Sequence, residues 1–421
     1  MNLRRNAVQG MASIASMMRC NQGAVQQWRR PGGLPDALRY HSPMPSPASH
    51  SAPIRDLPPY APALTGLRGV AAGWVLLFHL WQFMGTPRLA LGPLDFTPLF
   101  ARGHLGVDMF FVLSGYLIGG PWLVAKLRGE KRSLRGFWMR RIRRVLPAYW
   151  LQWLVLALVA WFGAAWMKNG PLPQGIAETL LGLTLTFNLT DPPLLNPVWW
   201  TLAVEWDFYL LAPLLAAGFA ARGSVPWLLP CIVLACVAFR VLCWWHVFEY
   251  FDGVLYRWVQ QLPSRLDQFA LGMTVAWAFA CGRAGRGAAL LALGLAGTLA
   301  MVWIGFHVGP IVDTGLAPWL FFEFTLVGCA FAALVGAAAL SDSALTMRLF
   351  ANRPLVFVGT ISYSLYLWHF PVLQWLRGFA LAQGWTTTSW AFAAAALSLS
   401  AGFAWLSYRV AERPLLRGRA G

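Results

Sequence analysis

Long apolar runs dominate the chain from about residue 60 onward. Ten of these runs have about the 20 residues that a helix needs to cross a bilayer. The pattern therefore predicts an all-α, polytopic integral membrane protein with about ten transmembrane helices. We expect the spans at roughly 62–84, 105–125, 145–167, 198–220, 225–245, 266–282, 287–307, 318–340, 354–378 and 386–408.

Two segments depart from this pattern. Residues 1–55 are rich in Arg, Ser, Pro and Gln and contain no long apolar run, so we expect a disordered basic cytosolic tail. The apolar run 176–189 is shorter than a span, which favours a re-entrant or interfacial helix. The expected organisation is a tail (1–55), a transmembrane domain (56–417) and a short basic C-terminal tail (418–421).

The composition and the position of the charges agree with this fold class. Hydrophobic residues make up 58% of the 421 residues and charged residues only 12%, about half the usual charged share, which excludes an ordinary soluble enzyme. The formal net charge of +17 falls in three segments, with +6 in 1–55, +8 in 126–144 and +3 in 409–421. Basic residues confined to the tails and one loop follow the positive-inside rule. We therefore expect a multi-pass protein of the cytoplasmic (inner) membrane with both termini in the cytosol, and no nucleic-acid partner.

The first predicted span carries Arg68 and His79, eleven residues apart. At about 100° and 1.5 Å per residue, the two side chains share one helix face and lie about 16 Å apart along the axis. Because histidine exchanges protons near neutral pH, this spacing suits an elongated anion whose reactive end points into the membrane. The spacing equally permits an arginine that reaches lipid phosphates and a histidine bonded to a neighbouring helix.

Four arginines precede the third predicted span: Arg140, Arg141, Arg143 and Arg144. Such a cluster commonly fixes topology or binds anionic lipids. Because the guanidinium group makes bidentate contacts with phosphate, the cluster is also a candidate phosphate-binding wall at the cytosolic end of the bundle.

Other polar residues lie inside the predicted spans, where a charge costs about 2.5–3.5 kcal/mol on insertion scales. Glu205 lies near the middle of the fourth span and requires a partner, for which Arg265, His79 or a polar substrate are candidates. An ion pair of Arg265 with Glu205 or Asp267 that simply holds helices together is an equal alternative. The further candidates for a cavity lining are Asp108, Arg265, Asp267, Ser362, Tyr366 and His369.

The second predicted span contains small residues at helical spacing. Gly115 and Gly119 form a small-xxx-small face that suits close helix packing. Ser114 has no base at a fixed sequence distance, so we interpret it as a packing residue. The chain has no Walker loop, GxGxxG, HExxH or metal-ligand cluster, so we expect no bound cofactor and no metal site.

Taken together, these segments resemble the membrane acyltransferase 3 family, the O-antigen acetylase-like O-acyltransferases. The resemblance covers about 60–417. It rests on seven motifs in order: the Arg68 and His79 pair, LGVDMFFVLSGYLI, RRIRRVLPAYW, WTLAVEWDFYLLAPL, RLDQFALG, ISYSLYLWHFPV and ERPLLR.

The resemblance implies an activity and roles for residues. It implies transfer of an acyl group, often acetyl, from a cytosolic acyl-CoA donor to a hydroxyl of a carbohydrate or lipid-linked envelope acceptor. It assigns His79 as base or acyl carrier, and Arg68 with the four-arginine cluster as contacts to the donor phosphates. Glu205 matches the acid of the fourth-span motif, whereas Trp206 stands where the family often has a second acid. We expect no appended extracytoplasmic SGNH-type domain.

A transporter or flippase of a polar lipid-linked or acylated molecule is the alternative function. Polar residues at mid-depth occur in both classes of membrane protein. The Arg68 and His79 pair together with the arginine cluster favours the acyltransferase.

Overall fold

The computed structural model describes residues 53–58, 61–163, 173, 175–189, 194–221, 225–250, 258–308 and 317–417. The predicted tail 1–55 therefore lies almost entirely outside the described residues, as does the C-terminal tail 418–421. Within the described residues the chain is helical apart from one hairpin, β1 (Ala90–Leu91) and β2 (Leu94–Asp95). The two strands are antiparallel and pair Ala90 with Asp95 and Leu91 with Leu94.

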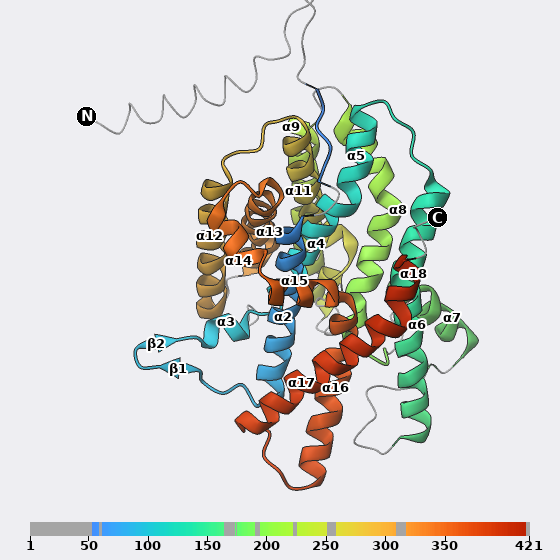
Figure 1. The fold of residues 1–421 in the computed structure, drawn as a ribbon, viewed down its shortest axis with the longest axis vertical. Helices are drawn as coiled ribbons and strands as arrows, with labels where there is room; N and C mark the ends of the chain where they lie inside the picture. The colour runs from blue at the N-terminus through green and yellow to red at the C-terminus, as the bar shows by residue number, and fades with distance from the viewer. Residues whose placement is uncertain are drawn as a thin grey trace, which may run out of the picture. The chain divides into compact units, whose positions relative to one another are not determined.

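The helices follow one another in the order shown in Figure 1. They are α2 (Pro62–Phe83), α3 (Thr97–Ala101), α4 (Leu105–Ser114), α5 (Gly120–Leu127), α6 (Leu134–Phe162), α7 (Ile176–Thr184), α8 (Trp200–Ala220), α9 (Val225–Tyr250), α11 (Leu262–Ala280), α12 (Gly287–Val308), α13 (Ala317–Leu340), α14 (Ala344–Phe350), α15 (Arg353–Thr360), α16 (Ser362–Ala382), α17 (Trp390–Ser407) and α18 (Arg413–Arg417). Two π-helical turns, η2 (Gly115–Gly119) and η6 (Tyr408–Glu412), join α4 to α5 and α17 to α18. Two 3₁₀ turns, η4 (Phe187–Leu189) and η5 (Pro197–Trp199), precede α8.

Within the described part of the chain, eight helical segments are long and apolar enough to cross a membrane, and the bent pair α15 and α16 can supply a ninth. The prediction of a helical, polytopic membrane protein is thereby confirmed. The predicted sixth span, 266–282, corresponds to α11, which is a helix but is not among these segments. Its polar residues Arg265, Asp267 and Gln268 are buried inside the protein, so α11 does not need the apolar composition of a lipid-facing helix.

Three predicted spans have different bounds in the structure. Helix α6 begins at Leu134 because the Ser133 hydroxyl accepts a hydrogen bond from the Gly136 amide and caps the helix. The arginine cluster is therefore part of α6 and not of a loop. The predicted span 354–378 is two helices bent by 75°. The last predicted span begins at Trp390, after the cap Ser389, and its helix continues through η6 into α18.

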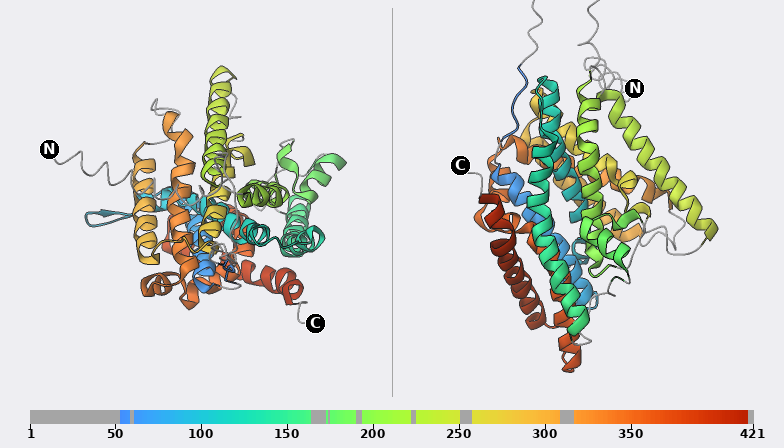
Figure 2. Two further views of the ribbon diagram at one scale, coloured as in Figure 1. Left: turned by 90° about the horizontal axis from the view of Figure 1, so that it is seen from above. Right: turned by 90° about the vertical axis from the view of Figure 1, so that its right-hand side faces the viewer.

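Contacts between residues show which helices run in the same direction. Arg68 bonds Ser362 near the start of α2 and α16, and His79 bonds His369 further along both helices. These two helices are therefore parallel. By the same reasoning, contacts between neighbouring helices give alternating directions along ten helical segments of the described chain: α2, α4 with α5, α6, α8, α9, α11, α12, α13, α16 and α17. The long helices lie alongside one another in Figure 2.

Helices α2, α4 and α11 lie at the centre, because most of the other helices pack on them. Glycines permit a very close approach between α11 and the second span. A Cβ atom on Gly115 would lie 2.0 Å from the Phe269 carbonyl oxygen, and one on Gly272 would lie 2.0 Å from the Val112 carbonyl oxygen. The predicted close-packing face of Gly115 and Gly119 thus meets α11, with Gly119 against Met273.

Candidate functional site

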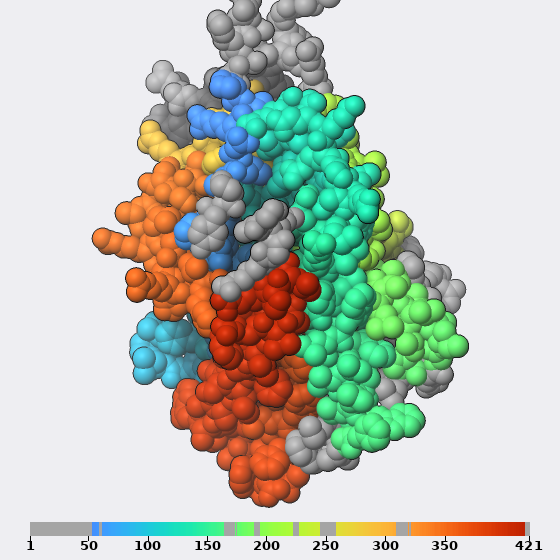
Figure 3. Space-filling model, turned by 45° about the vertical axis from the view of Figure 1, so that its right-hand side comes forward, coloured from blue at the N-terminus to red at the C-terminus, as the bar shows by residue number. Residues whose placement is uncertain are grey.

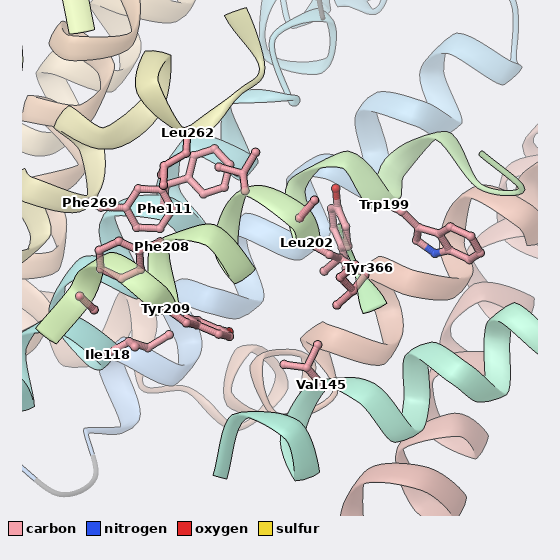
Figure 4. Close-up of a cluster of buried hydrophobic side chains, with 14 of the residues drawn as sticks. Phe111, Ile118, Val145, Trp199, Leu202, Phe208, Tyr209, Leu262, Phe269 and Tyr366 are labelled. Carbon is pink, nitrogen blue, oxygen red and sulfur yellow. The ribbon is translucent and has the colours of Figure 1, made fainter. Parts of the chain in front are cut away.

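A cavity of about 130 Å³ lies among α2, α4, α6, α8 and α16. Six of the residues predicted to form a site line it: Arg68, Arg141, Arg144, Glu205, Ser362 and Tyr366. The rest of its lining is largely apolar and aromatic. Val145, Tyr209 and Tyr366, which project from three different helices, are seen in Figure 4. Polar groups from distant parts of the sequence therefore converge in a largely apolar enclosure.

Three arginines, Arg68, Arg141 and Arg144, belong to the cavity lining and are together termed the arginine wall. The Arg68 Nη2 atom donates a hydrogen bond of 3.2 Å to the Ser362 hydroxyl, and the Arg141 guanidinium lies 5.9 Å from the centre of the Tyr209 ring. Arg144 forms an ion pair of 2.6 Å with Glu412, whose side chain is fully buried. Among the described residues, neither Arg68 nor Arg141 forms an ion pair, and Glu205 is the one carboxylate in the described cavity lining, so the lining keeps a net positive charge.

Glu205 faces the arginines from α8. Its Oε1 atom accepts a hydrogen bond of 2.7 Å from the Ser114 hydroxyl. Sequence spacing could not show this contact, because the two residues lie on different helices. Ser114 is thus more than a packing residue, since it holds the carboxylate that completes the polar lining of the cavity.

Two π-helical turns contribute residues to this cavity or to the partner of one of its arginines. In η2 the backbone widens directly after Ser114, and Leu117 and Ile118 of this turn line the cavity. In η6 the turn ends at Glu412, the partner of Arg144. Such turns often occur at functional sites because they redirect side chains within a helix. Figure 3 shows the C-terminal helices lying against α6, which allows this ion pair to form.

His79 lies outside the cavity lining and contacts His369 instead. The His369 Nε2 atom is 3.1 Å from the His79 Nδ1 atom. The His369 ring also lies beside Tyr366, with ring centres 5.6 Å apart. Because Tyr366 lines the cavity, one aromatic ring lies both beside His369 and at the cavity.

Asp108, Arg265 and Asp267 belong to buried ion pairs away from the cavity. Arg265 Nη1 is 2.6 Å from Asp108 Oδ1, and Asp267 Oδ2 is 2.7 Å from Arg240 Nη2. The proposed pairing of Arg265 with Glu205 or Asp267 is therefore wrong, because α11 brings Arg265 next to α4 and turns Asp267 towards α9. The alternative that Arg265 holds helices together is correct, with Asp108 as its partner.

Two buried charged residues inside predicted spans were not among the candidates. Arg240 on α9 is 2% exposed, and Glu323 on α13 is 3% exposed and pairs with Arg102. Their position within the apolar runs 225–245 and 318–340 was the available signal. The remaining arginines of the cluster, Arg140 and Arg143, do not line the cavity, and Arg143 is exposed. In the described chain no group of three or more His, Cys, Asp or Glu residues could hold a metal ion.

The fold and the cavity define a polytopic membrane protein that can hold an anion between its helices, close to a pair of histidines. Comparison with known families then identifies the chain as a member of the acyltransferase 3 family, whose model, an acyltransferase domain, matches residues 62–409. The resemblance drawn from the seven motifs is thereby confirmed.

Individual relatives are similar over most of this chain. A peptidoglycan O-acetyltransferase, OatA, of Listeria monocytogenes is 27% identical over 336 residues, which cover 75% of this chain and 49% of that protein. An O-acetyltransferase OatA of Staphylococcus aureus is 27% identical over 347 residues, which cover 76% of this chain and 52% of that protein. The chain thus spans about half the length of these curated relatives. No solved structure matches the chain.

Proposed function

We propose that the chain is a membrane O-acetyltransferase that takes an acetyl group from a cytosolic acyl-CoA donor and passes it to a hydroxyl of a cell-envelope carbohydrate. The observation that carries the proposal is the cavity whose lining keeps a net positive charge, because Arg68 and Arg141 are opposed by the single carboxylate of Glu205. Membership of an acyltransferase family, with relatives named as O-acetyltransferases, supports the reaction class.

The donor occupies the arginine wall in this proposal. Guanidinium groups bind phosphate through strong charge-assisted hydrogen bonds, and the low dielectric of a cavity within the membrane strengthens them. Arg68 and Arg141 contact the donor phosphates. The acyl end of the donor extends along α2 towards His79, about 16 Å further along the helix axis.

His79 performs the proton transfer. Its imidazole removes the proton of the acceptor hydroxyl, the hydroxyl oxygen attacks the acyl carbon, and the bond to the CoA sulfur breaks. The departing thiolate takes up the proton that His79 holds, so charge and atoms balance. Transfer through a covalent acyl-histidine remains the second route for the same residue.

Ten membrane crossings fit this proposal. Because the ten helical segments alternate in direction, α2 and α16 are parallel only if an even number of turns in direction separates them. Counting α7 as a further crossing would require α6 and α8 to be parallel, whereas their contacts make them antiparallel. The helix directions therefore support ten crossings in which α2 begins and α17 ends on the same side. In this proposal that side is the cytosol, in keeping with the positive-inside rule, and the arginine wall lies at the cytosolic end of the bundle in the inner membrane.

The acceptor belongs to the cell envelope in this proposal. The Listeria relative is named for peptidoglycan, so a peptidoglycan sugar hydroxyl is the first acceptor to test. Mass spectrometry of peptidoglycan and surface glycans from a deletion strain should show the loss of acetyl groups from one of them. A strain that retains every acetyl group would refute the carbohydrate acceptor.

A binding experiment with matched variants tests the donor site. We expect acetyl-CoA to raise the melting temperature of the purified chain more than acetyl-dephospho-CoA does, since the latter lacks one phosphate. Arg141→Gln should remove one charge-assisted hydrogen bond, worth about 1.5–3 kcal/mol, and raise the KM for acetyl-CoA by about 10- to 100-fold.

Arg143→Gln is the matched control, because Arg143 lies two positions away on the same helix but is exposed and outside the cavity lining. It should leave the KM unchanged. Equal KM values for the two variants would refute the donor site. Binding of acetyl-CoA without any acyl transfer would favour the transporter.

A further inference from the structure

The His79 and His369 pair determines which nitrogen of His79 exchanges protons. The two rings meet through His79 Nδ1 and His369 Nε2 at 3.1 Å. A single hydrogen lies between these atoms, so one nitrogen donates and the other accepts. The backbone carbonyl groups beside the two rings decide which nitrogen donates.

Each ring also contacts its own helix backbone. The His79 Nδ1 atom lies 3.1 Å from the Val75 carbonyl oxygen, and the His369 Nδ1 atom lies 3.1 Å from the Leu365 carbonyl oxygen. A carbonyl oxygen can only accept a hydrogen bond. Both Nδ1 atoms therefore carry hydrogen.

The protonation of both rings follows from these contacts. Since His369 donates through Nδ1 and accepts through Nε2, it is a neutral imidazole. The Nδ1 hydrogen of His79 is shared between the Val75 carbonyl and His369 Nε2. The Nε2 atom of His79 is then the nitrogen whose lone pair is available for proton exchange.

The surrounding rings hold the pair in this arrangement. His369 is 1% exposed, and the Phe370 ring meets His79 edge-on with ring centres 5.2 Å apart. The Tyr366 hydroxyl donates to the Val198 carbonyl oxygen at 2.8 Å and accepts from the Thr201 hydroxyl at 2.8 Å. These bonds anchor Tyr366, one turn before His369, to η5 and α8, so the acceptor nitrogen has little freedom to move away.

We propose that His369 is a positioning residue that fixes the tautomer and orientation of His79 by accepting its Nδ1 hydrogen. When His79 takes a proton on Nε2, its Nδ1–H becomes a charged donor, and hydrogen bonds from charged donors are stronger. His369 thereby stabilises the protonated state of His79, as a carboxylate does in the serine hydrolase triad. This proposal rests on the proposed function, since it needs His79 to act as an acid and base.

Substitution of His369 by Gln and by Asn forms a matched pair. The Gln amide oxygen lies about where His369 Nε2 lies and can accept the His79 hydrogen, whereas the Asn amide is one methylene shorter and does not reach. We expect His369→Asn to lower the kcat for acetyl transfer about 10- to 100-fold. This is a part of the 10²–10⁴-fold that acid–base catalysis contributes. His369→Gln should retain most of the wild-type kcat, and neither variant should change the KM for acetyl-CoA.

His369→Phe is a second variant that has no acceptor but keeps a ring in the buried site. Its kcat should fall as far as that of His369→Asn. His307→Gln, at an exposed histidine of α12, controls for the loss of any histidine and should leave kcat unchanged.

Two results separate this proposal from the function on which it rests. Equal kcat values for His369→Gln and His369→Asn, with His79→Ala inactive, would overturn the positioning role of His369 and leave the proposed function intact. Acetyl transfer at the normal rate by His79→Ala would overturn the function itself.

Discussion

Breaking the ion pair between Arg240 and Asp267 should destabilise the protein without changing the chemistry. The two side chains are 1% and 0% exposed, and their closest atoms are 2.7 Å apart. In Asp267→Asn the Arg240 guanidinium stays buried, because the carbonyl oxygens of Ser264 and Phe321 still bind it. Its charge then has no carboxylate partner.

The expected size follows from the burial. Removing one partner of a buried ion pair costs about 3–5 kcal/mol, because an uncompensated charge remains in a low dielectric. At about 2 °C per kcal/mol for a large chain, the melting temperature should fall by about 6–10 °C. Arg240→Met alone leaves Asp267 unpaired and should cost a similar amount.

The double variant Arg240→Met with Asp267→Asn tests the reasoning directly. It leaves no buried charge, so its loss of stability should be smaller than the sum of the two single losses by about 3 kcal/mol. The assay is the melting temperature of purified protein in detergent, with acetyl transfer per folded molecule measured alongside. Additive losses would show that the pair is not coupled. A loss of activity per folded molecule would place the pair in the catalytic machinery.

Three further predictions test the packing, the cavity and the surface. Gly272→Ala places a Cβ atom 2.0 Å from the Val112 carbonyl oxygen and should lower the free energy of unfolding by about 1–3 kcal/mol or more in thermal melts. Gly402→Ala is the control: nothing lies within 4 Å of that position, so the variant should be neutral or stabilising. Glu412→Gln should lower the melting temperature, because Glu412 is fully buried against Arg144. It should also lower the KM for acetyl-CoA, since the freed Arg144 lines the cavity. An unchanged KM would contradict this. Arg88→Gln breaks the exposed pair with Asp95 and should change stability by no more than about 1 kcal/mol, so a larger shift in the melt would show that the hairpin contributes to the fold.

The apolar pattern predicted the helices well, because burial in lipid requires long hydrophobic runs wherever they occur in the sequence. It predicted their ends less well. The start of α6 depends on the Ser133 cap, and the bend before α16 lies inside the segment 354–378, which the hydrophobic pattern predicts as a single span. Helix α11 shows a further limit, since its polar residues bond to α4, α9 and α13, and the local sequence cannot reveal these partners.

The candidate site was predictable where chemistry is local and not where it depends on packing. Arg68, Glu205 and the arginine cluster were visible as charges within or beside apolar runs. The sequence did not show which of the charged residues would line the cavity and which would form buried ion pairs. Asp108 and Arg265 look as suited to a cavity as Arg68 does, and only the relative positions of α4 and α11 make them an ion pair. The contact between His79 and His369 joins residues of the first and ninth predicted spans, which no spacing rule connects.

The sorted charges also favour one chemical type of occupant for the cavity. Buried charges in a membrane protein must be compensated, and the described pairs on α4, α9, α11 and α13 are neutral. At the cavity, Glu412 compensates Arg144, which leaves Arg68 and Arg141 against the single carboxylate of Glu205. The lining therefore carries a net charge of one positive unit in a low dielectric, where an additional cation would be repelled and a neutral sugar would leave an arginine uncompensated. An anionic donor supplies the missing negative charge, and this favours a phosphate-bearing acyl donor over an uncharged acceptor as the molecule that occupies the arginine wall.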